Sequence, residues 1–440
     1  MMVTNMREMK ESGILSIGLI PKTWDLCRIK DLFIDNNNGI KVGPFGSSLG
    51  SAVVSESEGE YKVYGQANLI RRDFSFGDNY VKETDYQRLK GYEVLSGDIA
   101  VSMMGTIGKC SVIPNDIQKG IMDSHLIKIR LTPNYVPKYF EYLYESDAVF
   151  TQLLLKNKGS IMTGLNSTIV KGIYFLNPPI KEQELIVSFL NSKCTEIDAL
   201  YTNIQSQIDS LEVYKRSVIT EAVTKGLNKN VEMKDSGMAW IGAIPNHWLI
   251  EKVKYHLIRK ETKNQADKQV LSVYREYGVI PKDSRDDNHN VTSEDTSKYK
   301  YVRQGNLVIN KMKAWQGSMG VSDYEGIVSP AYFIYHFTDD LLLPKYIHYL
   351  FRGCYKDEFR RISGGIREGQ WDLDPDEFAN TMLLIPPIKE QEAIVRLIEE
   401  KIPEIESIIA TKKEQLEVLS EYKKSLIYEY VTGKKEVPTI

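Results

Sequence analysis

The sequence of 440 residues lacks any long hydrophobic run and contains little cysteine. No stretch of roughly 18 consecutive apolar residues occurs, so we expect no membrane-spanning helix. The first residues, MMVTNMREMKES, do not show the basic-then-apolar layout of a secretory signal. The cysteines of the chain are scattered singly, without the spacing of a metal site or of a disulfide framework. They are Cys27, Cys110, Cys194 and Cys354. We therefore expect a cytoplasmic protein with no metal site.

An excess of charge of either sign is also lacking. The chain has 56 Lys and Arg against 59 Asp and Glu, a net charge of -3. Residues 177–228 and 385–440 carry a small acidic excess, and the remainder is close to neutral. A nucleic-acid partner would therefore have to meet a local basic face. The length exceeds what one hydrophobic core usually supports and predicts two domains.

The most informative feature present is a repeated heptapeptide. PPIKEQE begins at Pro178 and again at Pro386, 208 residues later. When residues 177–224 are aligned without gaps to residues 385–432, 21 of 48 positions are identical. A second match joins MKESGILSIGLIPKTW (9–24) to MKDSGMAWIGAIPNHW (233–248). The chain therefore contains two copies of the same succession of regions, namely a short segment, a variable region and a helical segment.

These matches divide the chain into two domains and two helices. We expect globular domains over residues 1–176 and 229–384, and long helices within residues 177–228 and 385–440. The two globular regions share the triplet Pro-Lys-Tyr, at residues 137 and 344, and otherwise little identity. Short runs of β-branched and aromatic residues, broken by Gly, Asn and Asp, predict strands and hairpins. We expect each to be a mixed α+β domain with a curved sheet.

Each helical segment has the sequence signals of a single long helix. Its prolines suit a first helical turn, where the amide donor is dispensable. Glu182 and Glu390 place negative charge near the positive end of the helix dipole. Gly226 and Gly433 mark the expected ends. About 46 residues lie between these signals, or roughly 70 Å of helix.

Apolar residues recur three and four positions apart along both segments, which predicts a coiled-coil seam. The alternative is that each helix lies on the core of its own domain. Because the two patterns are equal, we expect the helices to pair, and the connections require an antiparallel pair with pseudo-twofold symmetry. A charge, Lys412, interrupts the second seam opposite Ile204. The predicted seam residues are Leu190, Cys194, Ile197, Tyr201, Ile204, Ile208, Leu211, Val218 and Ala222, with Ile398, Ile402, Ile405, Ile409, Leu416, Leu419, Leu426 and Tyr430.

This organisation resembles the specificity (S) subunit of type I restriction–modification systems. The resemblance covers nearly the whole chain. It is carried by the PPIKEQE helix after each of two unlike domains, by the GPFGS loop at residues 43–47 and by the GDI…GTIG hairpin at residues 97–108. It implies that the globular regions are target recognition domains, each binding one half of an asymmetric bipartite site in double-stranded DNA. The helices would act as a ruler between them.

The same resemblance implies partner proteins. The helices would dock two modification (methyltransferase) subunits, which methylate adenine, and two restriction subunits would join to cut DNA. S-adenosylmethionine, ATP and Mg²⁺ would then be bound by those subunits, and we expect no cofactor on this chain.

Two motifs suggest catalysis only superficially. Residues 177–180, Asn-Pro-Pro-Ile, are similar to the Asn-Pro-Pro-aromatic motif of amino-methyltransferases, but the aromatic residue is replaced by Ile180. Residues 105–110, GTIGKC, are similar to a phosphate-binding loop, but a cysteine follows the lysine where that loop needs a hydroxyl. We therefore predict no catalytic residue, and interpret the chain as a non-catalytic subunit.

Sequence-specific DNA contacts require Arg, Lys, Asn, Gln, Ser or Thr side chains at base edges and basic groups at phosphates. Such residues gather in loops of both globular regions. The candidates for DNA contact are Lys41, Ser47, Ser48, Gln66, Asn68, Arg71, Arg72 and Lys109 in the first, and Arg275, Lys311, Lys313, Gln316, Arg360, Arg361, Arg367 and Gln370 in the second.

Outward positions of the helices are candidates for contact with partner proteins. They are Glu182, Lys193 and Gln207 in the first helix, and Glu390, Lys401 and Gln415 in the second. Two other functions remain open. One is a structural adaptor in which the coiled coil joins two protein-binding heads without DNA contact. The other, which the incomplete motifs disfavour, is a stand-alone DNA methyltransferase.

Overall fold

The computed structural model describes residues 7–34, 39–44, 46–57, 59–156, 164–265, 267–275, 277–284, 295–365 and 371–438. The chain divides into unit 1, which comprises Met1–Asn203 and Gln415–Ile440, and unit 2, which comprises Ile204–Glu414. The division falls inside both long helices. The sequence-based boundaries treat the helices as separate regions, whereas each unit combines a globular head with part of both helices. Among the described residues, no helix has the length and hydropathy that a membrane crossing requires.

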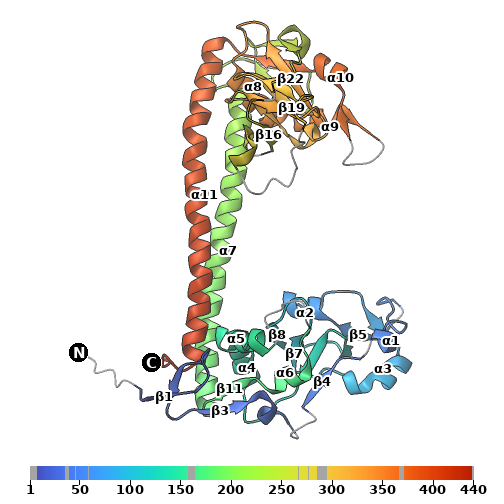
Figure 1. The fold of residues 1–440 in the computed structure, drawn as a ribbon, viewed down its shortest axis with the longest axis vertical. Coiled ribbons are helices and arrows are strands. Elements are labelled where there is room, and N and C mark those ends of the chain that lie inside the picture. The colour runs from blue at the N-terminus through green and yellow to red at the C-terminus, as the bar shows by residue number, and fades with distance from the viewer. Residues whose placement is uncertain are drawn as a thin grey trace, which may run out of the picture. The chain divides into compact units, whose positions relative to one another are not determined.

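Unit 1 contains a mixed α+β head, as the sequence predicts. Its elements are β1 (Met9–Glu11), β2 (Leu19–Pro21), β3 (Asp25–Arg28), η1 (Ile29–Leu32), β4 (Ile40–Val42), α1 (Gly46–Leu49), β5 (Tyr61–Tyr64), α2 (Gln66–Arg71), β6 (Tyr80–Val81), α3 (Glu83–Leu89), η2 (Lys90–Tyr92), β7 (Ile99–Ser102), β8 (Cys110–Val112), β9 (Gly120–Met122), β10 (Leu126–Ile129), α4 (Pro137–Glu145), α5 (Asp147–Lys156), α6 (Ser167–Lys171), β11 (Tyr174–Asn177) and the start of α7 (Ile180–Lys225). One antiparallel sheet has the order β4-β10-β7-β8, and a second has the order β6-β5-β9. The second sheet, with α1 and α3, lies on the side of the head remote from α7 (Figure 1).

Unit 2 repeats this plan with different strands at its outer part. Its elements are the end of α7, then β12 (Met233–Asp235), β13 (Ala243–Pro245), β14 (Leu249–Lys252), η3 (Val253–Tyr255), β15 (Leu257–Arg259), β16 (Leu271–Tyr274), β17 (Gly278–Pro281), η4 (Lys282–Ser284), β18 (Lys300–Val302), β19 (Leu307–Asn310), η5 (Ala314–Gln316), β20 (Met319–Val321), β21 (Gly326–Val328), β22 (Tyr332–Phe337), α8 (Pro344–Cys354), α9 (Lys356–Arg361), β23 (Ser363–Gly364), β24 (Asp372–Leu373), α10 (Pro375–Asn380), β25 (Met382–Ile385) and most of α11 (Ile388–Val431). The sheet order β15-β22-β19-β20 matches β4-β10-β7-β8 of unit 1.

The long helices belong to the cores of the heads. In unit 1 the main core cluster joins Trp24 and Phe140 to Leu190 of α7 and to Val431 of α11. In unit 2 the corresponding cluster contains residues from the end of α7 and the beginning of α11, such as Val223 and Ile394. Burying each large apolar side chain contributes roughly 1.5–3 kcal/mol. Both alternatives raised by the sequence therefore hold in part, since the helices pack on the heads as well as on each other.

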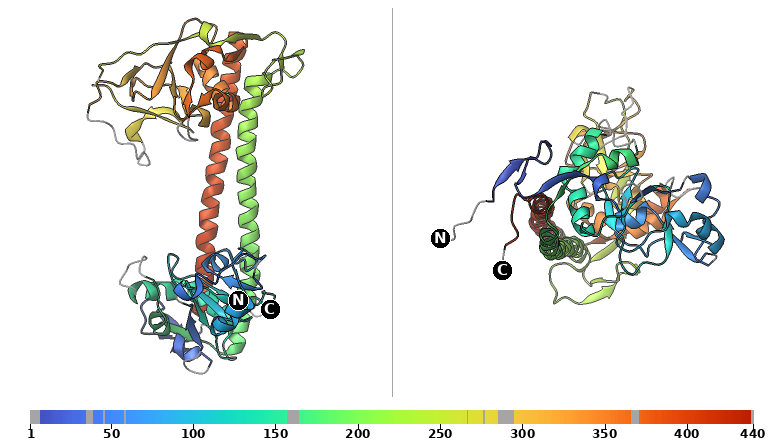
Figure 2. Two further views of the ribbon diagram at one scale, coloured as in Figure 1. Left: turned by 90° about the vertical axis from the view of Figure 1, so that its right-hand side faces the viewer. Right: turned by 90° about the horizontal axis from the view of Figure 1, so that it is seen from below.

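Within each unit α7 and α11 lie side by side and run antiparallel (Figures 1 and 2). In unit 1, Asp198 forms an ion pair with Lys423 at 2.5 Å, while the earlier Phe189 stacks near the later Tyr430, with ring centroids 4.5 Å apart. In unit 2, Lys215 reaches Glu406 at 3.2 Å.

The predicted seam is largely confirmed by burial. Its buried members are Leu190, Cys194, Ile197, Ile208, Ala222, Ile398, Ile405, Ile409, Leu416, Leu426 and Tyr430. Tyr201 is the exception, because 42% of its side chain is exposed. Lys412, the charge that interrupts the seam, donates a hydrogen bond to the Gln207 side chain, so its ammonium group has a partner on the other helix.

The repeated heptapeptide joins each head to a long helix through a buried glutamine. Gln183 is fully buried; its Oε1 accepts a hydrogen bond from Val136 N at 2.8 Å, and its Nε2 donates to Pro178 O at 2.9 Å. In unit 2, Gln391 makes the same contacts with Leu343 N, at 2.7 Å, and Pro386 O, at 2.8 Å. Val136 and Leu343 directly precede the short helices α4 and α8. The heptapeptide therefore recurs because the same junction is built twice.

The repeated Pro-Lys-Tyr triplet joins the same short helices to the end of the other long helix. The hydroxyl of Tyr139 on α4 donates to Val431 O of α11 at 2.8 Å, and the hydroxyl of Tyr346 on α8 donates to Val223 O of α7 at 3.1 Å. The last carbonyl groups of a helix have no partner within the helix. Both tyrosines are completely buried, so they satisfy carbonyl groups that water does not reach.

The second repeat, at residues 9–24 and 233–248, packs on the helix ends. Gly226 and Gly433 both have φ of 70°, the left-handed conformation expected at a helix stop. A Cβ on Gly433 would also lie 2.5 Å from Pro21 Cγ, and one on Gly226 would lie 3.1 Å from the Trp248 ring. Glycine is therefore required there by conformation and, at Gly433, by close packing too.

Replacing Tyr139 or Tyr346 with phenylalanine is expected to destabilise the chain by about 1–3 kcal/mol each, because each substitution leaves a buried carbonyl without a donor. Urea unfolding of the full chain measures this loss. Tyr422→Phe provides the control, since 56% of Tyr422 is exposed. Equal losses in all three variants would contradict the role assigned to the two buried hydroxyls.

Candidate nucleic-acid interface

The two heads present equivalent hairpins at the ends of their central strands. The first hairpin comprises β7, β8 and the loop 103–109, and the second comprises β19, β20 and the loop 311–318. Gly105 and Gly108 have φ of 71° and 87°, and Gly317 has φ of 86°. The segment GTIGKC is therefore a hairpin turn, as the sequence analysis concludes, and not a phosphate-binding loop.

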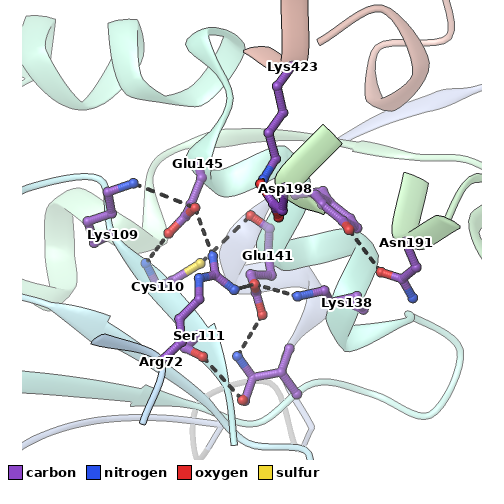
Figure 3. A network of polar contacts seen from close by, with 12 residues as sticks. Arg72, Lys109, Cys110, Ser111, Lys138, Glu141, Glu145, Asn191, Asp198 and Lys423 are labelled. Carbon is purple, nitrogen blue, oxygen red and sulfur yellow. Dashed lines mark hydrogen bonds and ion pairs between the residues drawn. The ribbon is translucent and has the colours of Figure 1, made fainter. Parts of the chain in front are cut away.

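Two predicted DNA contacts of the first head lie in a polar network beneath the first hairpin (Figure 3). Arg72 forms ion pairs with Glu141 and, at 3.0 Å, with Glu145. Lys109 lies 3.7 Å from Glu145. The same carboxylates accept hydrogen bonds from the hairpin backbone, Glu145 from Cys110 N at 3.2 Å and Glu141 from Val112 N at 2.9 Å.

The network fixes the charge state of its buried members. Burial of Glu141 raises its pKa, but Arg72 and Lys138 lower it by more, so the net shift is downward. Burial lowers the pKa of Arg72, yet the two glutamates raise it overall. Arg72 and Lys109 keep about half of their side chains exposed, at 47% and 51%, so both remain within reach of a phosphate. Their contact with DNA stays a prediction.

Gln66 and Asn68 on α2 have different roles. The Gln66 side chain donates to Met104 O and, at 3.2 Å, to Thr106 Oγ1, so it lies against the tip of the first hairpin. Asn68 is buried, at 4% exposure. Its side chain accepts from Gly65 N and donates to Asp73 O and Phe76 O. The prediction that Asn68 reads a base is therefore wrong, because its amide groups hold the α2 turn together.

The other candidates of the first head are dispersed. Lys41 is exposed and lies over the Tyr92 ring, and Arg71 lies over the Phe76 ring. Ser48 is half-buried on α1. The side chain of Ser47 lies outside the described residues. These residues stay predictions, and the structure joins none of them to the first hairpin by a described polar contact.

The second head brings its candidates together around the second hairpin. Arg275 donates to Gln316 Oε1 at 2.7 Å, and Lys311 forms an ion pair with Asp372 at 2.7 Å. Lys313 is exposed. The hairpin tip therefore presents a lysine and a glutamine, the residue types that read base edges and phosphates.

Two tryptophans at this tip were missed as functional candidates. Trp315 and Trp371 pack together with ring centroids 5.5 Å apart, and the Arg360 guanidinium lies 6.0 Å from the Trp371 ring. Both rings are half-exposed. No sequence signal singles out Trp315, since nothing in the sequence places residue 371 beside it. Arg361 is bound to Glu358 at 2.8 Å, while Arg367 and Gln370 lie outside the described residues.

The interior of the second head holds a neutral histidine beneath its hairpin. His348 on α8 accepts a hydrogen bond from Val321 N at its Nδ1, at 3.1 Å. Burial lowers the pKa of His348 to about 3, and the positive charges of Arg352 and Lys345 add to the shift. The imidazole is thus neutral at pH 7, as the accepted hydrogen bond requires.

Comparison with known proteins identifies the arrangement. Residues 21–210 match the family model described as the type I restriction modification DNA specificity domain. A protein of Methanocaldococcus jannaschii, named as the MjaX type I restriction enzyme specificity subunit, is 24% identical over 96% of both chains. The resemblance to the specificity subunits of type I restriction–modification systems that the sequence predicts is thereby confirmed.

Solved structures agree on the fold. The HsdS subunit of Thermoanaerobacter tengcongensis superposes with a TM-score of 0.52 at 14% identity, covering 94% of this chain and 98% of that one. A chain from a structure describing complex assembly and conformational transition of a type I R-M system superposes with a TM-score of 0.67 at 12% identity, covering 94% and 99%. These structures confirm the two-headed α+β fold with coiled-coil helices expected from the sequence. The DNA-specificity role is confirmed by the family model and by the Methanocaldococcus jannaschii relative.

Two residues predicted to contact partner proteins also bind residues of their own units, and their contact with partners stays a prediction. Glu182 accepts from Trp24 Nε1 at 2.8 Å and pairs with Arg7 at 2.6 Å. Glu390 likewise accepts from Trp248 Nε1 at 3.0 Å and contacts His247. Both glutamates are thus engaged inside their own units. Of the remaining candidates, Lys193 and Lys401 pair with Glu196 and Glu404 on their own helices, and Gln207 and Gln415 are exposed.

Within the described residues of the specificity subunit, no group of three or more His, Cys, Asp or Glu side chains is arranged to hold a metal ion. The prediction of no cofactor on this chain is a separate matter and stays a prediction.

Stability of the specificity subunit should fall as the pH decreases from about 6.5 toward 3, in part through His348. Over this range the unfolded histidine binds a proton while the folded one, with its pKa of about 3, does not, which favours the unfolded state. His348→Gln keeps a hydrogen-bond acceptor and should lose less free energy of unfolding between pH 7 and pH 4.5. His125→Gln, at an exposed position, serves as the control, and an unchanged pH dependence in His348→Gln would contradict the expectation.

Proposed function

We propose that each head of this specificity subunit binds one half of an asymmetric, bipartite DNA target. The bound subunit would position two modification subunits for adenine methylation and, in the complete complex, two restriction subunits for cleavage. The chain itself performs no chemistry in this proposal. S-adenosylmethionine, ATP and Mg²⁺ would act on the partner subunits, in the cytoplasm where the DNA is found.

One observation carries this proposal. The two units repeat the contacts that join head to helix, through Gln183 and Gln391 and through Tyr139 and Tyr346, but they differ at their hairpins. The first hairpin carries Lys109 beside Arg72, whereas the second carries Gln316, Lys313 and Trp315, with Trp371 packed against Trp315. A shared frame with two different reading surfaces suits two different half-sites. Cation contacts with phosphates would make binding strongly dependent on salt.

The experiment tests both the bipartite site and its spacing. Methylated adenines produced by the reconstituted complex are mapped, first with the natural chain and then with four residues inserted into both helices, after Gln205 and after Lys413. Four helical residues add about 6 Å, so the gap between half-sites should lengthen by about one to two base pairs at roughly 3.4 Å each. Both half-sites should keep their sequence.

A variant with the same four residues inserted in the turn after Gly226 controls for insertion itself, and should keep the original gap. Altered half-site sequences in the helix variant would overturn the idea that the helices set the spacing. Methylation without a bipartite pattern would overturn the proposed reading by two heads. Binding that ignores both salt and sequence would favour the adaptor function instead.

Exposed apolar residues support the docking of two copies of one partner. Leu200 and Ile408 occupy matching positions of the two helices, 208 residues apart, and are 54% and 47% exposed. Tyr214 and Tyr422 also match and are 55% and 56% exposed. The Asp198–Lys423 and Lys215–Glu406 pairs set the register, so each unit has one aliphatic residue and one tyrosine on neighbouring turns. An apolar surface that occurs twice suits a partner present twice, such as the modification subunits.

Leu200→Asp should remove one modification subunit from the complex, and Ile408→Asp the other, because a charge in a desolvated interface centre weakens binding by tenfold or more. Mass photometry of the reconstituted complex gives the number of subunits bound. Leu155→Asp, at a head position that is 72% exposed, should change nothing. Retention of both modification subunits by the double variant Leu200→Asp, Ile408→Asp would exclude this docking surface.

A further inference from the structure

The short helices α4 and α8 contact the reading hairpins through two matching positions. Aligned on Pro-Lys-Tyr, Glu141 corresponds to His348 and Glu145 to Arg352, each pair 207 residues apart. The two positions lie two and six residues after the tyrosine that binds the end of a long helix. Each short helix therefore contacts the long helices with one side and the hairpin with another.

In the first head both positions are acidic. Glu141 accepts from Val112 N of β8, and Glu145 accepts from Cys110 N of the same strand. Their remaining oxygens bind Arg72, which ends α2, and Glu145 also lies near Lys109 at the base of the hairpin loop. In Figure 3, dashed lines join Arg72 to both glutamates, and Glu145 to Cys110 and Lys109. The pair therefore holds three parts of the reading surface in one place.

In the second head the same two positions are neutral and basic. His348 accepts from Val321 N of β20, at the place where Glu141 accepts from β8. Arg352 donates to the carbonyl oxygen of Arg275 at 2.7 Å, and the Arg275 side chain in turn donates to Gln316 at the hairpin tip. A Cβ on Gly320 of β20 would lie 3.2 Å from His348 Cε1, so the strand packs closely on the ring.

The same hydrogen bond to the hairpin strand is thus made twice, by an anionic side chain in the first head and by a neutral one in the second. The other position differs too: Glu145 binds Arg72 and lies near Lys109, whereas Arg352 binds the backbone carbonyl of Arg275, whose side chain contacts the second hairpin at Gln316. We propose that Glu141 and Glu145, and at the matching positions His348 and Arg352, are positioning residues that set the orientation of each DNA-reading hairpin on its frame. This inference rests on the proposed function.

The charge at residue 145 has a second consequence in the first head. Glu145 partly neutralises Lys109 and Arg72, which are the cations nearest the first hairpin. A phosphate must compete with this carboxylate for both side chains. Glu145 thereby lowers affinity for any DNA and leaves discrimination to the geometry of the hairpin.

The test uses the reconstituted methyltransferase complex and duplexes that carry a single substitution in one half-site. Glu145→Gln should lower the affinity ratio between the intact site and a site altered in the first half by about fivefold, the value of a strong surface ion pair. The ratio for the second half should not change. Affinity for unrelated DNA should rise and depend more steeply on salt, because Lys109 loses its carboxylate partner and Arg72 keeps only Glu141.

Arg352→Met makes the reciprocal test in the second head. It should lower discrimination at the second half-site by a similar factor and leave the first unchanged. Tyr142→Phe and Tyr349→Phe are matched controls, because these tyrosines occupy corresponding positions of α4 and α8, and the Tyr142 hydroxyl donates to Asn191 of α7 rather than to the hairpin. Both controls should keep the ratios of the unaltered complex.

The possible results distinguish the positioning role from the proposed function. Ratios that stay unchanged in both Glu145→Gln and Arg352→Met, or that fall equally at both half-sites, would overturn the positioning role. A general loss of DNA binding by Glu145→Gln, with reduced affinity for unrelated DNA, would show structural damage rather than positioning and would also count against it. If the unaltered complex shows no half-site discrimination, the proposed function itself fails. Should one variant not fold, the other head still decides the inference.

Discussion

In each unit one short helix is hydrogen-bonded to the beginning of one long helix and to the end of the other. In unit 1, Gln183 binds Val136 N before α4, and Tyr139 of α4 binds Val431 O of α11. Leaving any of these buried groups unpaired would cost about 1–3 kcal/mol. The head of unit 1 therefore cannot turn on its helix ends without breaking several bonds at once. The orientation of everything that packs on α4, including the first hairpin, follows from this junction.

The same junction explains why parts of the sequence occur twice. The residues that recur in both halves of the sequence are those that join head to helices: the heptapeptide glutamine, the Pro-Lys-Tyr tyrosine, and the tryptophans Trp24 and Trp248 that bind Glu182 and Glu390. The sheet order also recurs. The hairpin tips, which contribute nothing to the junction, carry unrelated residues. A chain built this way can change what each head reads without disturbing how the head is attached.

Local signals predicted much of this fold. The helix ends at Gly226 and Gly433, most of the coiled-coil seam and the hairpin at residues 97–113 follow from residues close together in the chain. The failures concern partners far apart. Glu182 has the typical position of a helix-dipole charge, and only the fold brings Trp24, 158 residues away in sequence, to its carboxylate. In the sequence, Asn68 resembles a polar loop residue, whereas in the fold its side chain is bonded within the α2 turn. No sequence pattern placed Glu141 beside Arg72 or Trp371 beside Trp315, because those pairs depend on how helices cross strands.

The internal pairing of cations also explains how a chain of net charge -3 can act on DNA. Sequence recognition depends on the ratio between specific and non-specific affinity, since any genome offers a vast excess of wrong sites. A strongly basic head would raise both affinities together. In the proposed function, Arg72 and Lys109 of the first head face carboxylates that DNA would have to displace, so a phosphate would gain little unless the hairpin also fitted the bases. In the second head, Lys311 is held by Asp372 in the same manner. Under the proposed function, near-neutral heads would therefore favour discrimination between sites, and the acidic partners of the cations would be part of the reading surface rather than an obstacle to it.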